Sequence, residues 1–111
     1  MKAGSIIVAG QALGSEKKRP WLLAGIEGDM AAFVMLTSSC NKDQRPILPE
    51  ESGLSKPSYP AYGQSKLVPS RLCSLFPLVG EVGREVLDLL VEGAFISDET
   101  PEEVVRVLEE C

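Results

Sequence analysis

The sequence predicts a fold in which short β-strands come first and helices last, an α+β or mostly-β barrel with helices at its C-terminal end. Apolar runs between residues 6 and 68 are short and are separated by Gly, Pro or Asp, whereas helical periodicity begins only after Gly80. Ten glycines and eight prolines among 111 residues also indicate many turns. This length suits one domain, 1–111, with the barrel in about 4–72 and the helices in about 80–111.

Four apolar runs are short enough and sharply enough bounded to be strands. They are Ile6–Ala9, Trp21–Ile26, Ala31–Leu36 and Ala61–Val68. The second and third runs flank Glu27-Gly28-Asp29, which is typical of a β-hairpin turn. The range 40–60 holds four of the eight prolines, which predicts a long loop with an edge strand near Ile47-Leu48.

Two helices are expected after the strands. The first has an apolar face formed at positions i, i+4, i+7 and i+8 by Val82, Val86, Leu89 and Leu90. Gly93 is a plausible end for this helix. The second begins at Thr100-Pro101, where the Thr100 hydroxyl is expected to accept from the backbone N–H of Glu103 and three valines give an apolar side.

Charge is divided unevenly along the chain. Residues 1–72 carry nine Lys/Arg and six Asp/Glu, a net of +3, whereas residues 73–111 carry two and ten, a net of −8. The overall net charge of −5 argues against nucleic acid as a partner, because phosphate contacts need cations. The basic first part permits such a partner if it holds the site. The alternative is that the acidic segment only keeps a small domain soluble.

The cysteines and the absence of histidine restrict the chemistry. Three cysteines without C-x-x-C spacing predict neither a disulfide framework nor a zinc site, and free thiols suit the cytoplasm. A chain without histidine lacks the commonest metal ligand and the usual general base, so we expect no metal and no cofactor. The apolar run after Lys2 is too short for a signal peptide, and no stretch is long enough for a transmembrane helix.

An ordered set of short motifs identifies a resemblance. They are Gly14-Ser15-Glu16, Arg19-Pro20, Thr37-Ser38, Lys56-Pro57-Ser58-Tyr59, Gly63-Gln64-Ser65-Lys66 and Val79-Gly80. Over residues 4–92 this set resembles the MazF/PemK toxin family. The chain departs from the family in its short loop between Glu16 and Arg19, in Gly63 where an Asp is common, and in the acidic segment after Val91.

The resemblance implies an SH3-like small β-barrel that forms a homodimer. It also implies an endoribonuclease that cleaves single-stranded RNA in a groove on the dimer, and an antitoxin protein whose tail blocks that groove. Metal-independent cleavage uses the RNA 2′-OH as the nucleophile and leaves a 2′,3′-cyclic phosphate and a 5′-OH. Such a reaction needs one group that accepts the 2′-OH proton and another that stabilises charge at phosphorus.

Three residues are the candidates for this chemistry. Arg19 suits the phosphorus, because its planar fork pairs phosphate oxygens and stays charged. Glu16 is the candidate base, although a glutamate is a weak base at neutral pH unless its surroundings raise its pKa. Thr37 is expected to hold the scissile phosphate by a hydrogen bond.

Five further residues are expected to contact RNA. Ser38 follows Thr37 and offers a second hydroxyl to the phosphate. Lys66 is placed to neutralise a phosphate or protonate the leaving oxygen, and Gln64 to contact a base edge. The polar loop before Arg19 adds Lys17 and Lys18.

Two questions stay open from the sequence. Trp21, Tyr59 and Tyr62 are aromatics able to stack on bases, but Trp21 lies in an apolar run and is more typical of a core. The alternative function is a non-catalytic SH3-like binding module, or a degenerate toxin relative, that acts through protein–protein contacts. The lack of His, the glycine at position 63 and the acidic total favour that alternative.

Overall fold

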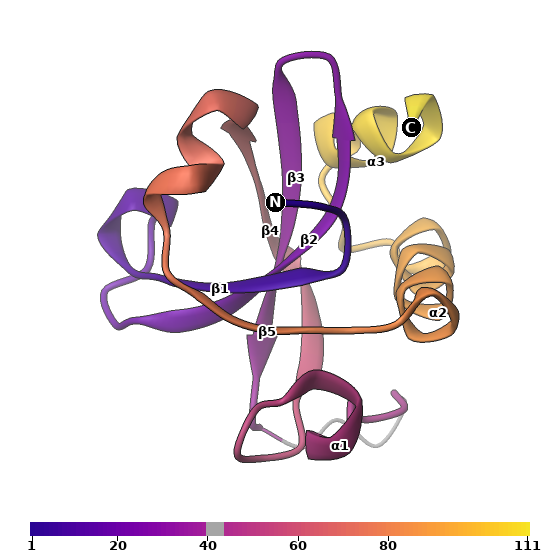
Figure 1. The fold of residues 1–111 in the computed structure, drawn as a ribbon. Coiled ribbons are helices and arrows are strands. Elements are labelled where there is room, and N and C mark those ends of the chain that lie inside the picture. The colour runs from indigo at the N-terminus through magenta and orange to yellow at the C-terminus, as the bar shows by residue number, and fades with distance from the viewer. Residues whose placement is uncertain (40–43) are drawn as a thin grey trace.

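A computed structural model describes residues 1–39 and 44–111. Their strands form one antiparallel sheet in the order β4-β3-β2-β1-β5 (Figure 1). The strands are β1 (Ser5–Ala9), β2 (Arg19–Glu27), β3 (Met30–Thr37), β4 (Tyr59–Pro69) and β5 (Leu78–Glu81). The helices are α1 (Pro49–Ser52), α2 (Arg84–Ile96) and α3 (Glu102–Glu110), with 3₁₀ helices η1 (Gln11–Leu13) and η2 (Ser70–Leu75).

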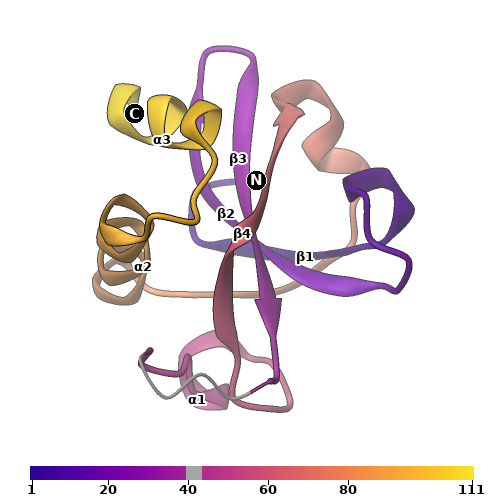
Figure 2. The same ribbon diagram turned by 180° about the vertical axis from the view of Figure 1, so that it is seen from behind.

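The two long helices α2 and α3 follow all the strands, as predicted, but the short helix α1 lies between β3 and β4. All four predicted strands are present, and Gly28 makes the β2–β3 turn with φ of +58°. Among the described residues the edge strands β4 and β5 do not pair with each other, so the sheet is open. The structure is therefore a mixed α/β fold with an antiparallel sheet, in which α2 and α3 cover one side (Figure 2). None of the helices described is long and apolar enough to cross a membrane.

Both faces of the central strands are buried, which explains their nearly continuous apolar sequences. Successive side chains of a strand point to opposite faces, so Ile6 and Ile7 enter different cores. One core lies under η1 and η2, and includes Trp21, Leu23 and Phe33. The opposite face packs against α2 and α3 through two clusters of residues, which include Leu22, Leu36, Val34, Leu90 and Val104.

A bulge of several residues interrupts β4. Phe33 of β3 pairs with Lys66, but Met35, two residues on, pairs with Ala61, so four residues of β4 lie opposite one of β3. The Ser65 hydroxyl donates to the Tyr62 carbonyl at 2.7 Å and closes this bulge. Bulges redirect side chains, and this one sets the positions of residues 62–65 relative to the sheet.

The two predicted helices are present, with three corrections. Leu87 is buried where Leu89 was expected, because the buried face of α2 consists of Leu87, Leu90 and Ala94. The helix also continues past Gly93 to Ile96. The predicted cap at Thr100 is wrong. Its hydroxyl instead donates to the Ala94 carbonyl at 2.8 Å, so it satisfies the end of α2 rather than the start of α3.

The long proline-rich loop has more structure than predicted. Residues 40–43, including Cys40, lie outside the described residues. Ile47 forms an isolated antiparallel bridge with Ser58, which matches the expected extended segment, but the short helix α1 follows. The Glu51 carboxylate accepts from the Leu48 N–H at 3.0 Å and pairs with Arg45 at 2.6 Å. The hydrogen bond from the Leu48 N–H lowers the pKa of Glu51, and the Arg45 guanidinium lowers it further.

Strand β5 was not predicted, and Gly80 allows it to lie close to α1. A Cβ atom at position 80 would collide with the backbone carbonyl oxygen of Ser52 in α1.

We therefore expect Gly80→Ala to lower the free energy of unfolding by about 2–3 kcal/mol, as overpacking does. Gly83→Ser is the control, because its side chain enters open space at the N-cap of α2 and is expected to be neutral or stabilising. Urea unfolding measures both, and equal stabilities would contradict the proposed close contact.

Candidate functional site

The loop between β1 and β2 is held by its own backbone. Leu13 is buried in the core, and Gly14 takes a left-handed conformation with φ of +80°. The Ser15 N–H donates to the Gly10 carbonyl at 3.1 Å, and the Ser15 hydroxyl donates to the Lys17 carbonyl at 2.7 Å. The exposed side chains of this loop therefore project from a fixed backbone.

Arg19 is fixed by its place at the start of β2. It pairs with Ala9, the last residue of β1. Two residues further on, the buried Trp21 donates from its indole N–H to the Ala9 carbonyl at 3.1 Å. The half-buried Arg19 side chain lies on the same face of the strand as Trp21.

Five of the predicted site residues line one hollow of about 320 Å³. We call it the Arg19 hollow. Trp21 and Met35 also line it, so it opens on the face of the sheet that packs against η1 rather than α2 and α3. The Lys66 side chain passes about 3.7 Å from the position a Cβ would take on Gly14. The predicted residues in it are Glu16, Lys17, Arg19, Gln64 and Lys66.

A second hollow, of about 210 Å³, shares Arg19 with the first. Lys18 and Ser38 line it, as does Lys56, to which the sequence analysis gave no role. Lys56 reaches this place because the chain returns after α1 and bridges Ile47 to Ser58, next to the start of β4. Lys56 and Arg19 are 37 residues apart in the sequence, so no short-range pattern predicts that they line one hollow.

Seven of the eight predicted site residues therefore line two adjoining hollows, and Thr37 lines neither. The Thr37 oxygen accepts a hydrogen bond from the Ser39 N–H at 3.2 Å, which turns the chain after β3. Its expected contact with a phosphate is not supported by this placement. Ser38, the next residue, is the exposed hydroxyl at the hollow.

The two hollows are strongly basic. Among the described residues the ion pairs are Lys2–Glu81, Arg45–Glu51 and Arg84–Asp88, so the cations at the hollows have no carboxylate partner there. Glu16 is the one carboxylate among the residues that line either hollow. Anions are attracted to such a surface. Its cations are Lys17, Lys18, Arg19, Lys56 and Lys66.

Two of the three aromatic candidates are structural. Trp21 is 1% exposed, which confirms the core interpretation and leaves its ring no face for a base. Tyr62 is buried, and its hydroxyl donates to the Leu90 carbonyl of α2 at 2.8 Å. Burial raises the pKa of Tyr62 to about 12. Tyr59 is half-buried and pairs with Thr37 in the sheet.

Gly63 lies beside a carboxylate. A Cβ atom at position 63 would be 3.3 Å from an oxygen of Glu99, in the segment between α2 and α3. An aspartate at this position would bring two negative charges together, which costs free energy. A glycine at position 63 therefore avoids this repulsion with Glu99. Residue 63 does not line the Arg19 hollow.

The comparisons with known proteins do not assign the chain to a family. No protein-family model matches it, and no curated protein matches it significantly.

Proposed function

We propose that the chain binds single-stranded RNA at the Arg19 hollow and its neighbour and cleaves it without a metal ion. The observation that carries this proposal is the group of five cations, unpaired among the described residues, around two hollows that share Arg19. Each cation is able to neutralise a phosphate of an extended strand. The motif resemblance to the MazF/PemK toxins supplies the cleavage chemistry.

In the proposed reaction, the 2′-oxygen of a nucleotide attacks the adjacent phosphorus and the bond to the 5′-oxygen breaks. Glu16 takes the proton from the 2′-OH, and Lys66 gives a proton to the departing 5′-oxygen. Arg19 pairs with the equatorial phosphate oxygens, where charge builds. The products are a 2′,3′-cyclic phosphate and a 5′-OH, so no metal or cofactor enters the balance. All three side chains line the same hollow.

A non-catalytic binding module is the second candidate. It is favoured by the exposed position of Glu16 and by the hydrogen bond that turns Thr37 back onto its own chain. Such a module would use the same cations to bind an anionic partner. RNA bound but not cleaved would support it.

Arg19→Ala is the first test of cleavage. We expect it to slow cleavage of a mixed-sequence RNA by about 10²–10³-fold, as the loss of one preorganised charge donor does in other enzymes. The assay contains EDTA, and the product ends are identified by their cyclic phosphate. Arg106→Ala is the matched control, since Arg106 is exposed on α3 and lines neither hollow. Undiminished cleavage by folded Arg19→Ala would remove Arg19 from the mechanism.

Lys56→Gln tests whether the second hollow belongs to the same RNA surface. We expect weaker RNA binding and a plot of log K against log salt that is less steep by about 0.7, the contribution of one phosphate on a single strand. Lys2→Gln is the control, because Lys2 lies against Glu81 and lines neither hollow. Fluorescence anisotropy at several salt concentrations gives the slopes. An identical slope for Lys56→Gln and the unsubstituted chain would exclude Lys56 from the interface.

The remaining implications of the resemblance are also proposals. The strongly curved sheet of Figure 1 is proposed to be a variant of the SH3-like barrel, open between β4 and β5. An antitoxin with an acidic tail would occupy the basic hollows, and competition between such a tail and RNA would reveal it. The proposed location is the cytoplasm, which suits the free thiols of Cys73 and Cys111.

We also propose a homodimer, formed through the apolar surface of η2 and β5. Leu75 is 73% exposed and Leu78 is 63% exposed, and Val79 lies beside them in the chain. Light scattering at micromolar concentrations is expected to report a mass of twice 12.0 kDa, and Leu78→Glu to reduce it. Ile26→Glu, at an exposed apolar residue elsewhere, is the control. A monomeric mass for the unsubstituted chain would refute the dimer.

A further inference from the structure

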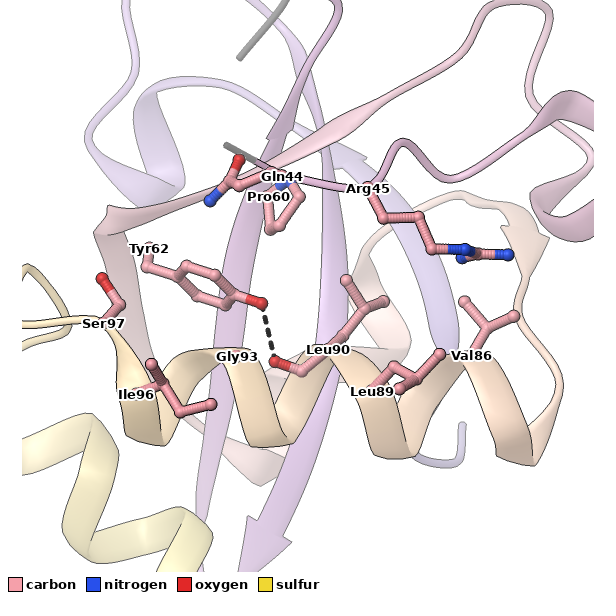
Figure 3. A pocket seen from close by; sticks show the side chains of 10 residues that line it. All are labelled: Gln44, Arg45, Pro60, Tyr62, Val86, Leu89, Leu90, Gly93, Ile96 and Ser97. Atoms are coloured by element: carbon pink, nitrogen blue, oxygen red, sulfur yellow. Dashed lines mark hydrogen bonds between the residues drawn. The ribbon is translucent and has the colours of Figure 1, made fainter. Parts of the chain in front are cut away.

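A third hollow differs from the two basic hollows because apolar side chains line most of it. It is a groove of about 350 Å³ between α2 and β4, on the helix-covered side of the sheet (Figure 3). Tyr62 and Pro60 of β4 line one side of it, together with Gln44 and Arg45. We call it the α2 groove. Its other side consists of Val86, Leu89, Leu90, Gly93 and Ile96.

The α2 groove is a preformed feature, because Tyr62 fixes the helix against the strand. Its hydroxyl donates to the Leu90 carbonyl at 2.8 Å, the bond drawn in Figure 3. A Cβ atom at Gly93 would collide with that hydroxyl, so the glycine permits the close approach. The two sides of the groove are therefore held at a fixed separation by a buried contact.

Two large apolar side chains of the groove are open to solvent. Leu89 is 53% exposed and Ile96 is 77% exposed. They are seven residues apart and so lie two turns apart on the same side of α2. Neither contributes to the apolar clusters of the core. Large exposed apolar side chains that line one groove are typical of interaction surfaces.

The border of the groove is acidic. Glu85 lies four residues before Leu89, and Glu92 lies four residues before Ile96, so each carboxylate is a neighbour of an exposed apolar side chain. Neither glutamate takes part in an ion pair among the described residues. Among the residues that the structure describes, the cation that lines the groove is Arg45, which is already paired with Glu51 at 2.6 Å.

The negative charge of Glu85 and Glu92 favours some partners of the α2 groove over others. A second copy of the chain would bring the carboxylates of two α2 helices together, and residues 73–111 carry ten acidic against two basic side chains. RNA and anionic lipid would meet the same repulsion. A basic partner would instead gain attraction at the border and apolar contact within the groove.

We propose that the α2 groove binds a basic amphipathic helix of a partner protein. The apolar side of that helix would cover Leu89 and Ile96, and its Lys or Arg side chains would face Glu85 and Glu92. From Val86 to Ile96 the rise of α2 is about 15 Å, three turns, which suits a partner helix with apolar residues at i, i+4 and i+7. This surface is separate from the Arg19 hollow, and the inference does not depend on RNA cleavage.

The test uses two synthetic helical peptides of about 15 residues with the same leucines at i, i+4 and i+7. One carries lysines on its polar side, and the other carries glutamates. Fluorescence anisotropy with the full chain is expected to show at least about tenfold tighter binding of the lysine peptide. NMR shifts are expected to map the peptide to α2 and Tyr62.

Matched variants separate groove binding from general attraction to an acidic protein. Glu85→Gln/Glu92→Gln is expected to weaken the lysine peptide about three- to tenfold. Glu109→Gln/Glu110→Gln makes the same change in net charge on α3 and is expected to leave affinity within about twofold. Ile96→Asp is expected to weaken binding more than about tenfold, while Ile26→Asp, at an exposed isoleucine of β2 that does not line the groove, is not.

Three outcomes would overturn the proposal. The first is equal binding of the two peptides at α2, as located by the NMR shifts, and the second is an equal effect of the two glutamine pairs. The third is self-association of the unsubstituted chain that Ile96→Asp abolishes, which would assign the groove to a second copy. Because Ile96 is exposed, circular dichroism is expected to show the same fold for Ile96→Asp, so a loss of binding is not a loss of structure.

Discussion

The hydrogen bond from the Trp21 indole to the Ala9 carbonyl is the interaction on which the arrangement of the basic surface depends. It is 3.1 Å long and buried, and an unsatisfied group in its place would cost about 1–3 kcal/mol. It locks the register of β1 against β2 at the point where the intervening loop closes. Arg19 begins β2 at this point. The pairing of Arg19 with Ala9 therefore also fixes where the loop between β1 and β2 begins and ends.

The basic hollows and the acidic helices involve different parts of the chain, because no residue of α2 or α3 lines either hollow. The central strands of the sheet bury side chains on both faces. The Arg19 hollow opens on the face that packs against η1, whereas Leu36 of the second hollow belongs to the cluster that packs against α2. The cations gather where β1 returns into β2 and where the chain enters β4. The carboxylates gather on α2 and α3, whose outer sides need only be polar. A chain with an acidic total is thereby able to present a basic surface.

Much of the fold was predictable because apolar runs report burial directly. The hairpin of β2 and β3 followed from two such runs and a glycine turn, and the periodicity after Gly80 located α2. Strand β5 was missed because Leu78 and Val79 face solvent, so its pairing with β1 leaves no trace in the pattern of burial. Thr100 was misread as an N-cap because a hydroxyl donates as readily as it accepts, and the Ala94 carbonyl is a tertiary neighbour.

The site was predictable to the extent that it is local in sequence. Glu16, Lys17 and Arg19 share one loop, and any structure of that loop would bring them together. Lys56 joins them only because the chain after α1 returns to the sheet, which no short-range pattern encodes. The apolar side chains of the α2 groove were likewise not predictable, because the helical spacing of Leu89 is the same as that of a core residue.

The bulge in β4 has a consequence for the behaviour of the protein at high concentration. An open sheet offers two edges to which strands of other molecules can add, and long, regular edges polymerise. Here one edge strand is interrupted at residues 62–65, where Glu99 packs against Gly63. The opposite edge, β5, is four residues long and meets α1 at Gly80. Neither edge is a long and regular template, which disfavours the addition of strands from other molecules.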